Sequence, residues 1–449
     1  MGRENYSKVT EPSRRTFLRA ATGIGAIATA GCLGSGSETT TQPGPAAGDT
    51  VTIGVNVASS GDYAVQGKEE RRGAELAVKH INEGGGWVGE DFFDGLSGDG
   101  LLGKTVDIAV RNTESDTETA RSAAQDAFDT DRAVMLCGGT AGQPALAQAD
   151  VAANRERIHM ITGAQLDALT SGDCSQYSFR EMFNSYSMAK VLRAELAERL
   201  GSDGIWFHQI HANNDWGREV QSHIQTEFAN LGWNTVGTEE VMLGTQDFGP
   251  ILETVNQRSP DVLFLNLPGF DAAVAIPQAK DILDDDVTIV VPRLTRRIAE
   301  TAGSKIAGVL GTIPWDPVMV RFDPTPLSRT LVNAYGQEYT GADAQYDEVP
   351  TGPTHLAYSQ VMQYAGAVER AGTFDADAVI SELTDQSYNV GMSVEETLRS
   401  CDHQSTRPAP VVEGRILGRQ RFGHYFALDT ISTETVYECD TGPATDCSL

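Results

Sequence analysis

Residues 51–57, Val-Thr-Ile-Gly-Val-Asn-Val, have the apolar and β-branched composition of a buried strand. A Ser-Gly-Asp turn follows at 60–62, and residues 67–82 then place apolar side chains at helical spacing. Three glycines at 84–86 are a signal for the end of this helix. A strand followed by a helix is the repeating unit of a parallel sheet, so this stretch indicates an α/β fold.

The same unit recurs along most of the chain. Because seven or more such units exceed one sheet of ordinary size, we expect two Rossmann-like lobes with parallel central sheets and right-handed crossovers. Residues 408–437 are β-rich and come after the last long helix. The further predicted strands lie at 105–111, 133–137, 158–162, 204–209, 236–241, 262–266 and 287–291, and the further predicted helices at 116–128, 144–154, 216–231, 248–257, 270–283 and 354–371.

The charge balance limits the possible partners. The chain has 449 residues, with 34 Lys and Arg against 62 Asp and Glu, so its formal net charge is −28. This charge excludes nucleic-acid binding through a general basic field. Only seven of the basic residues are lysine, which leaves 27 arginines. Because about 1 M salt shortens the Debye length to about 3 Å, an acidic, lysine-poor composition indicates a halophilic protein that stays soluble in concentrated salt.

The N-terminus reads as an export signal. Arg14 and Arg15 precede an apolar run of small residues at 20–30, which is too short to cross a bilayer of about 30 Å. Paired arginines before such a run are typical of twin-arginine export. The sequence Thr-Ala-Gly-Cys that ends at Cys32 is similar to a lipobox, and a plain cleaved signal is the alternative. We therefore expect residues 1–32 to be a lipoprotein signal that leaves the protein lipid-anchored on the extracytoplasmic face of the membrane.

Residues 33–49 are rich in Gly, Ser, Thr and Pro. Such a composition has little to bury and behaves as a flexible tether. The ordered protein is therefore expected to begin near Thr50.

The five remaining cysteines lie in a chain that is predicted to be exported, where disulfides form. Cys137 ends an apolar run and is expected to be a buried free thiol. The other four allow three pairings, and the sequence does not choose among them: Cys174, Cys401, Cys439 and Cys447.

No motif for catalysis or for a resident metal is present. His208 and His211 have His-x-x-His spacing, but they lie at the end of a predicted strand, which makes a zinc site improbable. The sequence Asp-His-Gln at 402–404 is more readily a hinge than an acid–base pair. Neither G-x-S-x-G nor H-E-x-x-H occurs. We expect no catalytic residue, metal or cofactor, and an exported two-lobed enzyme is a less favoured alternative.

Several segments in order resemble the type I periplasmic (solute-)binding protein family, specifically its branched-chain amino acid group. The resemblance extends from Thr50 to about residue 426. It implies two lobes that close on a small ligand and deliver it, as a monomer, to the membrane permease of an ABC importer. The segments that carry it are 53–55 (Ile-Gly-Val), 60–63 (Ser-Gly-Asp-Tyr), 72–78 (Arg-Gly-Ala-Glu-Leu-Ala-Val), 81–85 (Ile-Asn-Glu-Gly-Gly), 214–218 (Asn-Asp-Trp-Gly-Arg), 245–248 (Thr-Gln-Asp-Phe), 259–265 (Ser-Pro-Asp-Val-Leu-Phe-Leu) and 402–404 (Asp-His-Gln).

The same resemblance implies how the chain is divided between the lobes, which are joined by a three-crossover hinge. Lobe 1 would comprise residues 50–178 and 314–400, and lobe 2 residues 179–313 and 401–449. The crossovers would lie near 179–180, 312–314 and 402–404.

Ligands of open α/β sheets lie beyond the carboxyl ends of the strands, and the family's ligand contacts lie on the same loops. The loop after residue 138 opens a helix that Pro144 starts well, so its free N–H groups and the Thr140 hydroxyl suit a carboxylate. Trp216 and Phe270 follow strands of lobe 2 and would cover an apolar part of the ligand, although both are also plausible core residues. The candidate ligand-binding residues are Ser60, Tyr63, Gln66, Gly139, Thr140, Ala141, Ala164, Gln165, Trp216, Phe270 and Arg293.

Two segments depart from the pattern of amino acid binders. Residues 139–142 carry fewer hydroxyls than the Ser/Thr-rich turn of that group. Residues 292–297, Pro-Arg-Leu-Thr-Arg-Arg, stand where lobe 2 often supplies an acidic partner for the ligand's ammonium. If Arg293 faces the cleft rather than the surface, a carboxylate-bearing or amide ligand fits better than an α-amino acid. We predict a solute-binding protein for a branched-chain type amino acid or a related small carboxylate or amide, with a ligand-sensing receptor module as the alternative.

Overall fold

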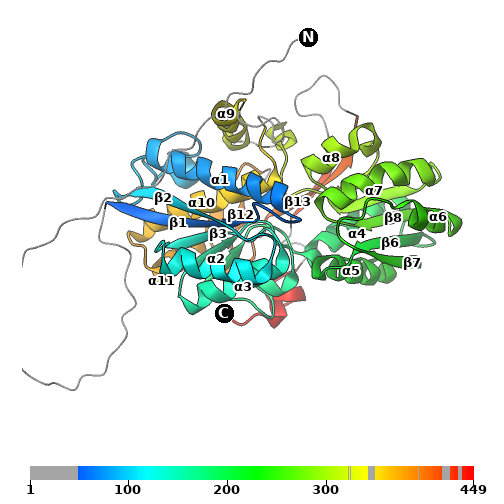
Figure 1. The fold of residues 1–449 in the computed structure, drawn as a ribbon, viewed down its shortest axis with the longest axis horizontal. Coiled ribbons are helices and arrows are strands. Elements are labelled where there is room, and N and C mark those ends of the chain that lie inside the picture. The colour runs from blue at the N-terminus through cyan, green and yellow to red at the C-terminus, as the bar shows by residue number, and fades with distance from the viewer. Residues whose placement is uncertain are drawn as a thin grey trace, which may run out of the picture. The chain divides into compact units, whose positions relative to one another are not determined.

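The computed structural model describes residues 49–449 except 322, 324, 342–348, 393, 417–424 and 433–436. The predicted export signal, with Arg14, Arg15 and Cys32, and the predicted tether up to residue 48 lie outside the described residues. The described chain forms two larger sheets, each surrounded by helices (Figure 1), and a small two-stranded sheet. The predicted α/β fold with parallel central sheets is therefore confirmed.

The first sheet has five parallel strands in the order β2-β1-β3-β4-β5. Two of its inner strands, β3 and β4, are completely buried, and apart from His159 and Gly138 their residues are apolar. We call this sheet with its covering helices lobe 1. The strands are β1 (Thr50–Val57), β2 (Thr105–Asn112), β3 (Met135–Gly138), β4 (Ile158–Ile161) and β5 (Ser178–Arg180).

The second sheet has seven strands in the order β14-β13-β10-β9-β8-β6-β7. Strands β6 to β10 are parallel, and the C-terminal β-rich segment adds β13 and β14 in antiparallel orientation at one edge. We call this sheet with its helices lobe 2. The strands are β6 (Trp206–Ala212), β7 (Asn234–Val241), β8 (Val262–Asn266), β9 (Thr288–Arg293), β10 (Leu310–Thr312), β13 (Pro408–Gly414) and β14 (Tyr425–Ser432); β11 (Ser387–Tyr388) and β12 (Glu396–Thr397) form the small sheet.

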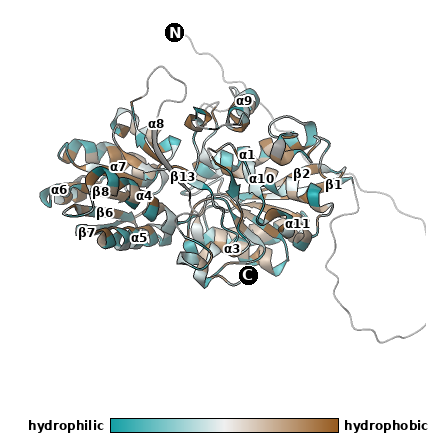
Figure 2. Cartoon of the chain, turned by 180° about the vertical axis from the view of Figure 1, so that it is seen from behind, coloured by the Kyte–Doolittle hydropathy of each residue, from teal (hydrophilic) through white to brown (hydrophobic). Residues whose placement is uncertain are grey.

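Amphipathic helices cover both sheets, and Figure 2 shows hydrophilic and hydrophobic segments side by side on them. Lobe 1 carries α1 (Ala64–Glu83), α2 (Thr117–Asp129), α3 (Gly142–Asn154), α9 (Leu327–Tyr339), α10 (Gly352–Ala371) and α11 (Ala376–Leu383). Lobe 2 carries α4 (Ser185–Leu200), α5 (Asp215–Leu231), α6 (Gly249–Gln257), α7 (Gly269–Ile282) and α8 (Arg296–Ala302). Short 3-10 turns are η1 (Asp91–Phe93), η2 (Asp167–Thr170), η3 (Gly303–Ile306), η4 (Pro317–Arg321) and η6 (Gly442–Asp446).

Three connections between the two sheets lie side by side, near the positions that were expected for the crossovers. The Arg180 N–H, at the end of β5, donates to the His403 carbonyl at 3.0 Å, and the Ser405 N–H donates back to the Arg180 carbonyl at 2.9 Å. The Ile313 N–H, just after β10, donates to the Pro410 carbonyl at 3.1 Å. Backbone hydrogen bonds therefore join the first and second connections to the third.

Two disulfides resolve the pairing that the sequence left open. Cys174 pairs with Cys447, and Cys401 pairs with Cys439, while Cys137 is buried and free, as predicted. The first bond attaches the C-terminus to the segment between β4 and β5 of lobe 1, where η6 also contacts η2 (Figure 1). The last residues, which were expected in lobe 2, are thus held by lobe 1.

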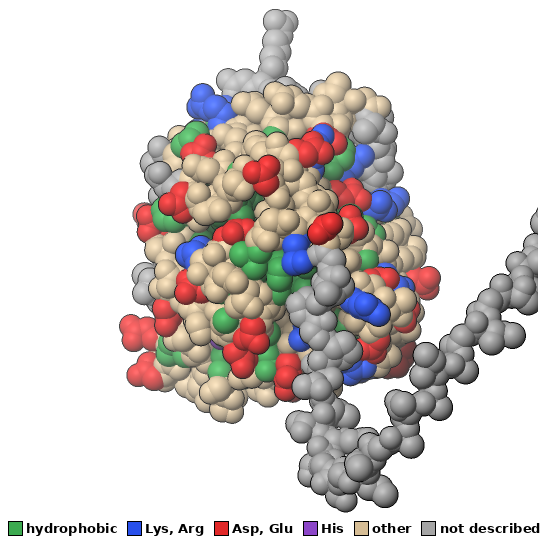
Figure 3. Space-filling model, turned by 90° about the vertical axis from the view of Figure 1, so that its left-hand side faces the viewer, with side chains coloured by type: hydrophobic (Ala, Val, Ile, Leu, Met, Phe, Trp, Pro, Cys, Tyr) green, Lys and Arg blue, Asp and Glu red, His purple; other side chains and the backbone are tan. Residues whose placement is uncertain are grey.

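The acidic side chains do not gather at one place on the face that Figure 3 shows; they are scattered over it, with a few basic side chains between them. This face therefore carries no single acidic patch. Among the described residues, no helix is both long enough and apolar enough to cross a membrane.

Removal of the Cys174–Cys447 bond by serine at both positions should lower the free energy of unfolding by about 2–4 kcal/mol, because the bond restricts the unfolded chain. Denaturant titration measures this change. In a variant with all four bonded cysteines replaced, a reductant should have no further effect. Peptide mapping that links Cys174 to Cys401 or Cys439 would contradict the pairing.

Candidate functional site

A pocket lies between the lobes, beyond the carboxyl ends of β1, β3, β4, β6, β8 and β9. The space between its walls, including the part open to solvent, is about 420 Å³. The residues that line it are Tyr63, Gln66, Thr140, Ala141, Gly142, Gly163, Ala164 and Gln165 from lobe 1, and Trp216, Pro268, Gly269, Arg293 and Thr295 from lobe 2.

Eight of the eleven candidate residues line this pocket, and three do not. Ser60 is exposed, and its hydroxyl accepts a hydrogen bond from the Asn112 amide at 2.8 Å, at the end of β2. Phe270 is 59% exposed, and the two residues before it, Pro268 and Gly269, contact the pocket instead. Because Phe270 lies in the first turn of α7, the turn of the helix directs its side chain away from the neighbouring residues that face the pocket.

Gly139 shapes the pocket without lining it. Its φ of +101° lies in the left-handed region that favours glycine, and its carbonyl accepts from the Ala164 N–H at 2.9 Å. This conformation turns the chain from β3 into α3. The sequence predicted that this helix starts at Pro144, but α3 begins at Gly142. Ala141 and Gly142 both line the pocket, so the first turn of the helix lies at the pocket.

Glu70, a residue that sequence reasoning missed, fixes the hydrogen-bonding role of the pocket side chain Thr140. Glu70 is fully buried in α1, and its carboxylate accepts from the Thr140 hydroxyl at 2.7 Å and from the Gln66 amide at 3.2 Å. The ionised Glu70 carboxylate accepts the single hydroxyl hydrogen of Thr140 in this hydrogen bond. Thr140 therefore offers the pocket a lone pair, whereas the sequence suggested a donor for a carboxylate.

The sequence did carry a signal for Glu70. The apolar face of α1 includes Ala74, Ala77 and Ile81, and Glu70 is four residues before Ala74 on the same face. An acidic residue on a buried helical stripe is costly unless hydrogen bonds satisfy it. The presence of Glu70 on the buried face of α1 therefore indicates a polar site between this helix and the sheet.

Burial raises the pKa of Glu70 to about 7, although hydrogen bonds from Thr140, Gln66 and Thr162 and the charge of Arg293 all act in the opposite direction. Burial is also the main cause of a raised pKa at the nearby Cys137 thiol, to which the charge of Glu70 contributes. The carboxyl group of Glu70 therefore changes its charge near neutral pH.

Arg293 is the single charged side chain among the pocket-lining residues. It ends β9 in lobe 2, its side chain is nine-tenths buried, and its Nη1 donates to the Gly163 carbonyl of lobe 1 at 3.1 Å. Its Nε and Nη2 atoms have no hydrogen-bond partner. Glycine is needed at 163 because a Cβ atom there would lie 2.4 Å from the Gln66 amide nitrogen and 2.6 Å from a Glu70 carboxylate oxygen.

Three further side chains of the pocket have unused hydrogen-bonding capacity. The Trp216 indole nitrogen and the Gln165 side-chain oxygen are buried without partners. The Tyr63 hydroxyl accepts from the Asn214 amide at 3.2 Å and keeps its own proton to donate. Burial raises the pKa of Tyr63 to about 12, so this proton stays on the hydroxyl at neutral pH.

Polar contacts join the lobes around the pocket. Asn214 caps α5 of lobe 2 by accepting from the Gly217 N–H, and the same side chain reaches Tyr63 of lobe 1. Arg297 in α8 pairs with the buried carboxylate of Glu69 in α1 at 2.8 Å. These contacts and the Arg293–Gly163 hydrogen bond hold the lobes against each other.

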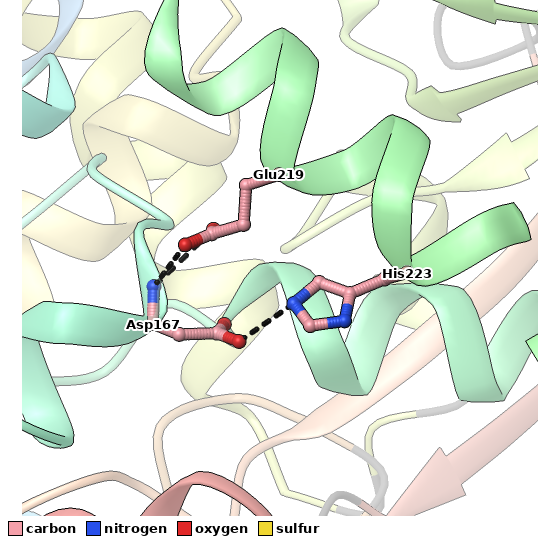
Figure 4. Close-up of side chains that lie close together, drawn as sticks. All are labelled: Asp167, Glu219 and His223. Atoms are coloured by element: carbon pink, nitrogen blue, oxygen red, sulfur yellow. Dashed lines mark hydrogen bonds and ion pairs between the residues drawn. The ribbon is translucent and has the colours of Figure 1, made fainter. Parts of the chain in front are cut away.

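A cluster of Asp167, Glu219 and His223 also joins the lobes (Figure 4). The Asp167 N–H donates to the Glu219 carboxylate, and the Asp167 carboxylate lies 2.7 Å from the His223 Nε2 atom. Burial lowers the pKa of His223, but the hydrogen bond and charge of Asp167 outweigh it and raise this pKa. Since these groups bind one another, the cluster acts as a contact between η2 and α5.

Neither histidine motif of the sequence forms a reactive site. His208 and His211 both lie on β6, and because they are three residues apart their side chains point to opposite faces of the sheet. Asp402 pairs with Arg399, whereas the His403 ring stacks on Phe179 at 4.0 Å. The two neighbours Asp402 and His403 thus contact different partners within the hinge.

Two α/β lobes with a polar pocket between them define a class of proteins that bind small solutes. A family model described as periplasmic binding protein matches residues 50–418. The chain is 22% identical over 350 residues to Leu/Ile/Val-binding protein homolog 1 of Brucella abortus (strain 2308). This alignment covers 75% of this chain and 82% of that protein.

Solved structures share the fold of this chain. The amino acid ABC transporter substrate-binding protein of Pseudomonas fluorescens Pf-5 aligns with a TM-score of 0.76 at 22% identity, over 89% of this chain and 99% of that one. An ABC transporter solute-binding protein of R. palustris in complex with 4-hydroxybenzoate aligns with a TM-score of 0.71 at 18% identity, over 85% of this chain and 97% of that one. The chain belongs to the periplasmic binding protein family, type I, in the branched-chain amino acid group. Proteins of this family and fold are substrate-binding proteins rather than enzymes.

The raised pKa of Glu70 predicts a pH-dependent stability. The folded chain keeps this proton up to about pH 7, whereas an unfolded glutamate loses it near pH 4.3, so rising pH over this window destabilises the folded state. The free energy of unfolding of wild type relative to Glu70→Gln should fall by roughly 3 kcal/mol between pH 4 and pH 8.

Denaturant titrations of both proteins across this range measure the effect. The exposed Glu253→Gln variant is the control, and its difference from wild type should not show this fall. A wild-type to Glu70→Gln difference that is constant with pH would show that Glu70 does not titrate in this window.

Proposed function

We propose that this protein is the extracytoplasmic solute-binding component of an ABC importer and that it binds an amino acid or a related small carboxylate or amide. The observation that carries this proposal is the pocket between the lobes, in which Arg293 and Trp216 of lobe 2 face Tyr63, Thr140 and Gln165 of lobe 1. Unpartnered buried polar atoms on both walls favour a polar ligand that bridges the lobes.

Lobe closure is the proposed mechanism. The hydrogen bond from Arg293 to Gly163 and the ion pair between Arg297 and Glu69 exist only when the lobes meet. A ligand that binds groups of both lobes adds its own contacts to this closed state and shifts the population toward it. The closed form, acting as a monomer, would then dock on the membrane permease.

The proposed location follows from the N-terminal sequence. Arg14 and Arg15 would direct twin-arginine export, and lipidated Cys32 would anchor the protein on the outer face of the membrane. The net charge of −28 supports work in concentrated salt, where screening limits self-repulsion.

A small carboxylate or amide should raise the melting temperature of the purified full chain at high salt, because a ligand that binds only the folded state stabilises it. A thermal-shift panel of amino acids, hydroxy acids, simple carboxylates and amides measures this. No shift across the whole panel would reject the proposed function.

Cys32→Ser should release the protein from the membrane fraction into the medium, because a serine cannot carry the thioether-linked lipid. Cell fractionation of the expressing host measures the distribution. Cys137→Ser is the matched control and should stay with the membrane, since Cys137 is buried in lobe 1. Membrane retention of the Cys32→Ser variant would contradict the lipid anchor.

A further inference from the structure

The charges on the pocket wall restrict the ligand class, and this inference rests on the proposed function. Among the described residues that line the pocket, Arg293 is the one charged side chain, and none is a carboxylate. An α-ammonium group taken from water into this pocket would meet no carboxylate among the described residues that line it, and it would lie near a buried guanidinium. Desolvation without a partner and repulsion between like charges both oppose such binding.

The free edge of Arg293 has the geometry that a carboxylate requires. Its Nη1 is occupied by the Gly163 carbonyl, whereas Nε and Nη2 are unpartnered and buried. These two nitrogens form one edge of the planar guanidinium, so their N–H groups run parallel and match two carboxylate oxygens. A buried cationic group with this edge unpaired is an expensive feature unless a ligand completes it.

Other donors support an anionic group beside Arg293. Trp216 offers an indole N–H without a partner, and Tyr63 keeps a phenolic proton after accepting from Asn214. Both residues line the same pocket as Arg293. Lobe 2 with Tyr63 therefore forms the part of the wall that donates hydrogen bonds.

The opposite part of the wall accepts a hydrogen bond. The Thr140 hydroxyl donates a hydrogen bond to the buried, ionised carboxylate of Glu70, which does not itself line the pocket, and the Thr140 oxygen accepts from the Ala58 N–H at 3.4 Å. The Thr140 oxygen and the unpartnered Gln165 oxygen are thus acceptors. A neutral hydroxyl on the ligand satisfies these acceptors without adding a charge.

We propose that the ligand is a small hydroxy acid without an ammonium group, with its carboxylate on the Nε–Nη2 edge of Arg293 and its hydroxyl donating to Thr140. Among the other lining residues, which also include the polar Gln66 and Thr295, the apolar groups of Ala141, Ala164 and Pro268 suit a short hydrocarbon or ring between the two polar ends. Glu70 is then a positioning residue, since it acts on the ligand only through Thr140.

Matched ligands test this proposal with the wild-type full chain. Isothermal titration at high salt compares 2-hydroxy-4-methylpentanoate, 4-methylpentanoate and leucine, which share one carbon skeleton, and 4-hydroxybenzoate with benzoate. In at least one of the two series, the hydroxy acid should bind at least about 5-fold more tightly than the plain acid. Leucine should bind at least about 10-fold more weakly than the hydroxy acid of its own series.

Variants assign the two ends. Arg293→Lys keeps the charge but lacks the forked edge, so it should weaken the plain acid and the hydroxy acid alike by about 10-fold or more. Thr140→Val should weaken only the hydroxy acid, by about 5- to 10-fold, and Thr140→Ser should restore its affinity. Arg258→Lys, on the exposed outer side of lobe 2, is the control and should change neither.

The outcomes separate this proposal from the proposed function. Tightest binding by leucine would overturn the hydroxy-acid assignment and leave an amino acid binder. Equal affinity for hydroxy acids and plain acids would also overturn it. Because these comparisons use wild-type protein, they hold even if a variant fails to fold, which circular dichroism checks. No binding by any of these ligands, or by the wider panel, would reject the proposed function itself.

Discussion

One buried arginine ties the three connections between the lobes. The Arg407 side chain has no exposure to solvent, and its Nε donates to the Pro314 carbonyl of the second connection at 3.2 Å. Its Nη1 pairs with Glu181 of the first connection, and Arg407 itself lies in the third, just before β13. Breaking a buried ion pair by removing one partner costs about 3–5 kcal/mol, so the hinge depends on this cluster.

The groups around Arg407 stabilise its positive charge by accepting hydrogen bonds from the guanidinium. Its Nη2 lies 3.1 Å from Nδ1 of His355, and Nε2 of that ring lies 2.6 Å from the Val390 carbonyl. Burial lowers the pKa of His355 to about 3, so the ring is neutral and its Nδ1 accepts from the guanidinium while Nε2 donates. A second carboxylate, Glu396, lies 3.5 Å from Nη1, and burial raises its pKa. The fixed hinge determines which loops of the two sheets face each other, and thereby the composition of the pocket.

The sequence predicted most of the fold and much of the pocket, for identifiable reasons. Strand and helix periodicities are local, so the β1–α1 unit and its repeats were readable directly. The rule that ligands lie beyond strand ends led to Tyr63, Thr140 and Trp216, which line the pocket between the lobes. It also included Ser60 and Phe270, because loop position alone does not tell which way a side chain points.

The sequence by itself determined the α/β class, the two lobes, the loops that meet between them and the unusual arginine at position 293. These features follow from local periodicity and from residue type. The tertiary structure alone decided that Cys174 pairs with Cys447, that Glu70 accepts a hydrogen bond from Thr140, and that two nitrogens of Arg293 stay unpaired. The physical reason is that a hydrogen bond or disulfide depends on which distant groups come within about 3 Å or less of each other, and only the packed chain fixes those distances.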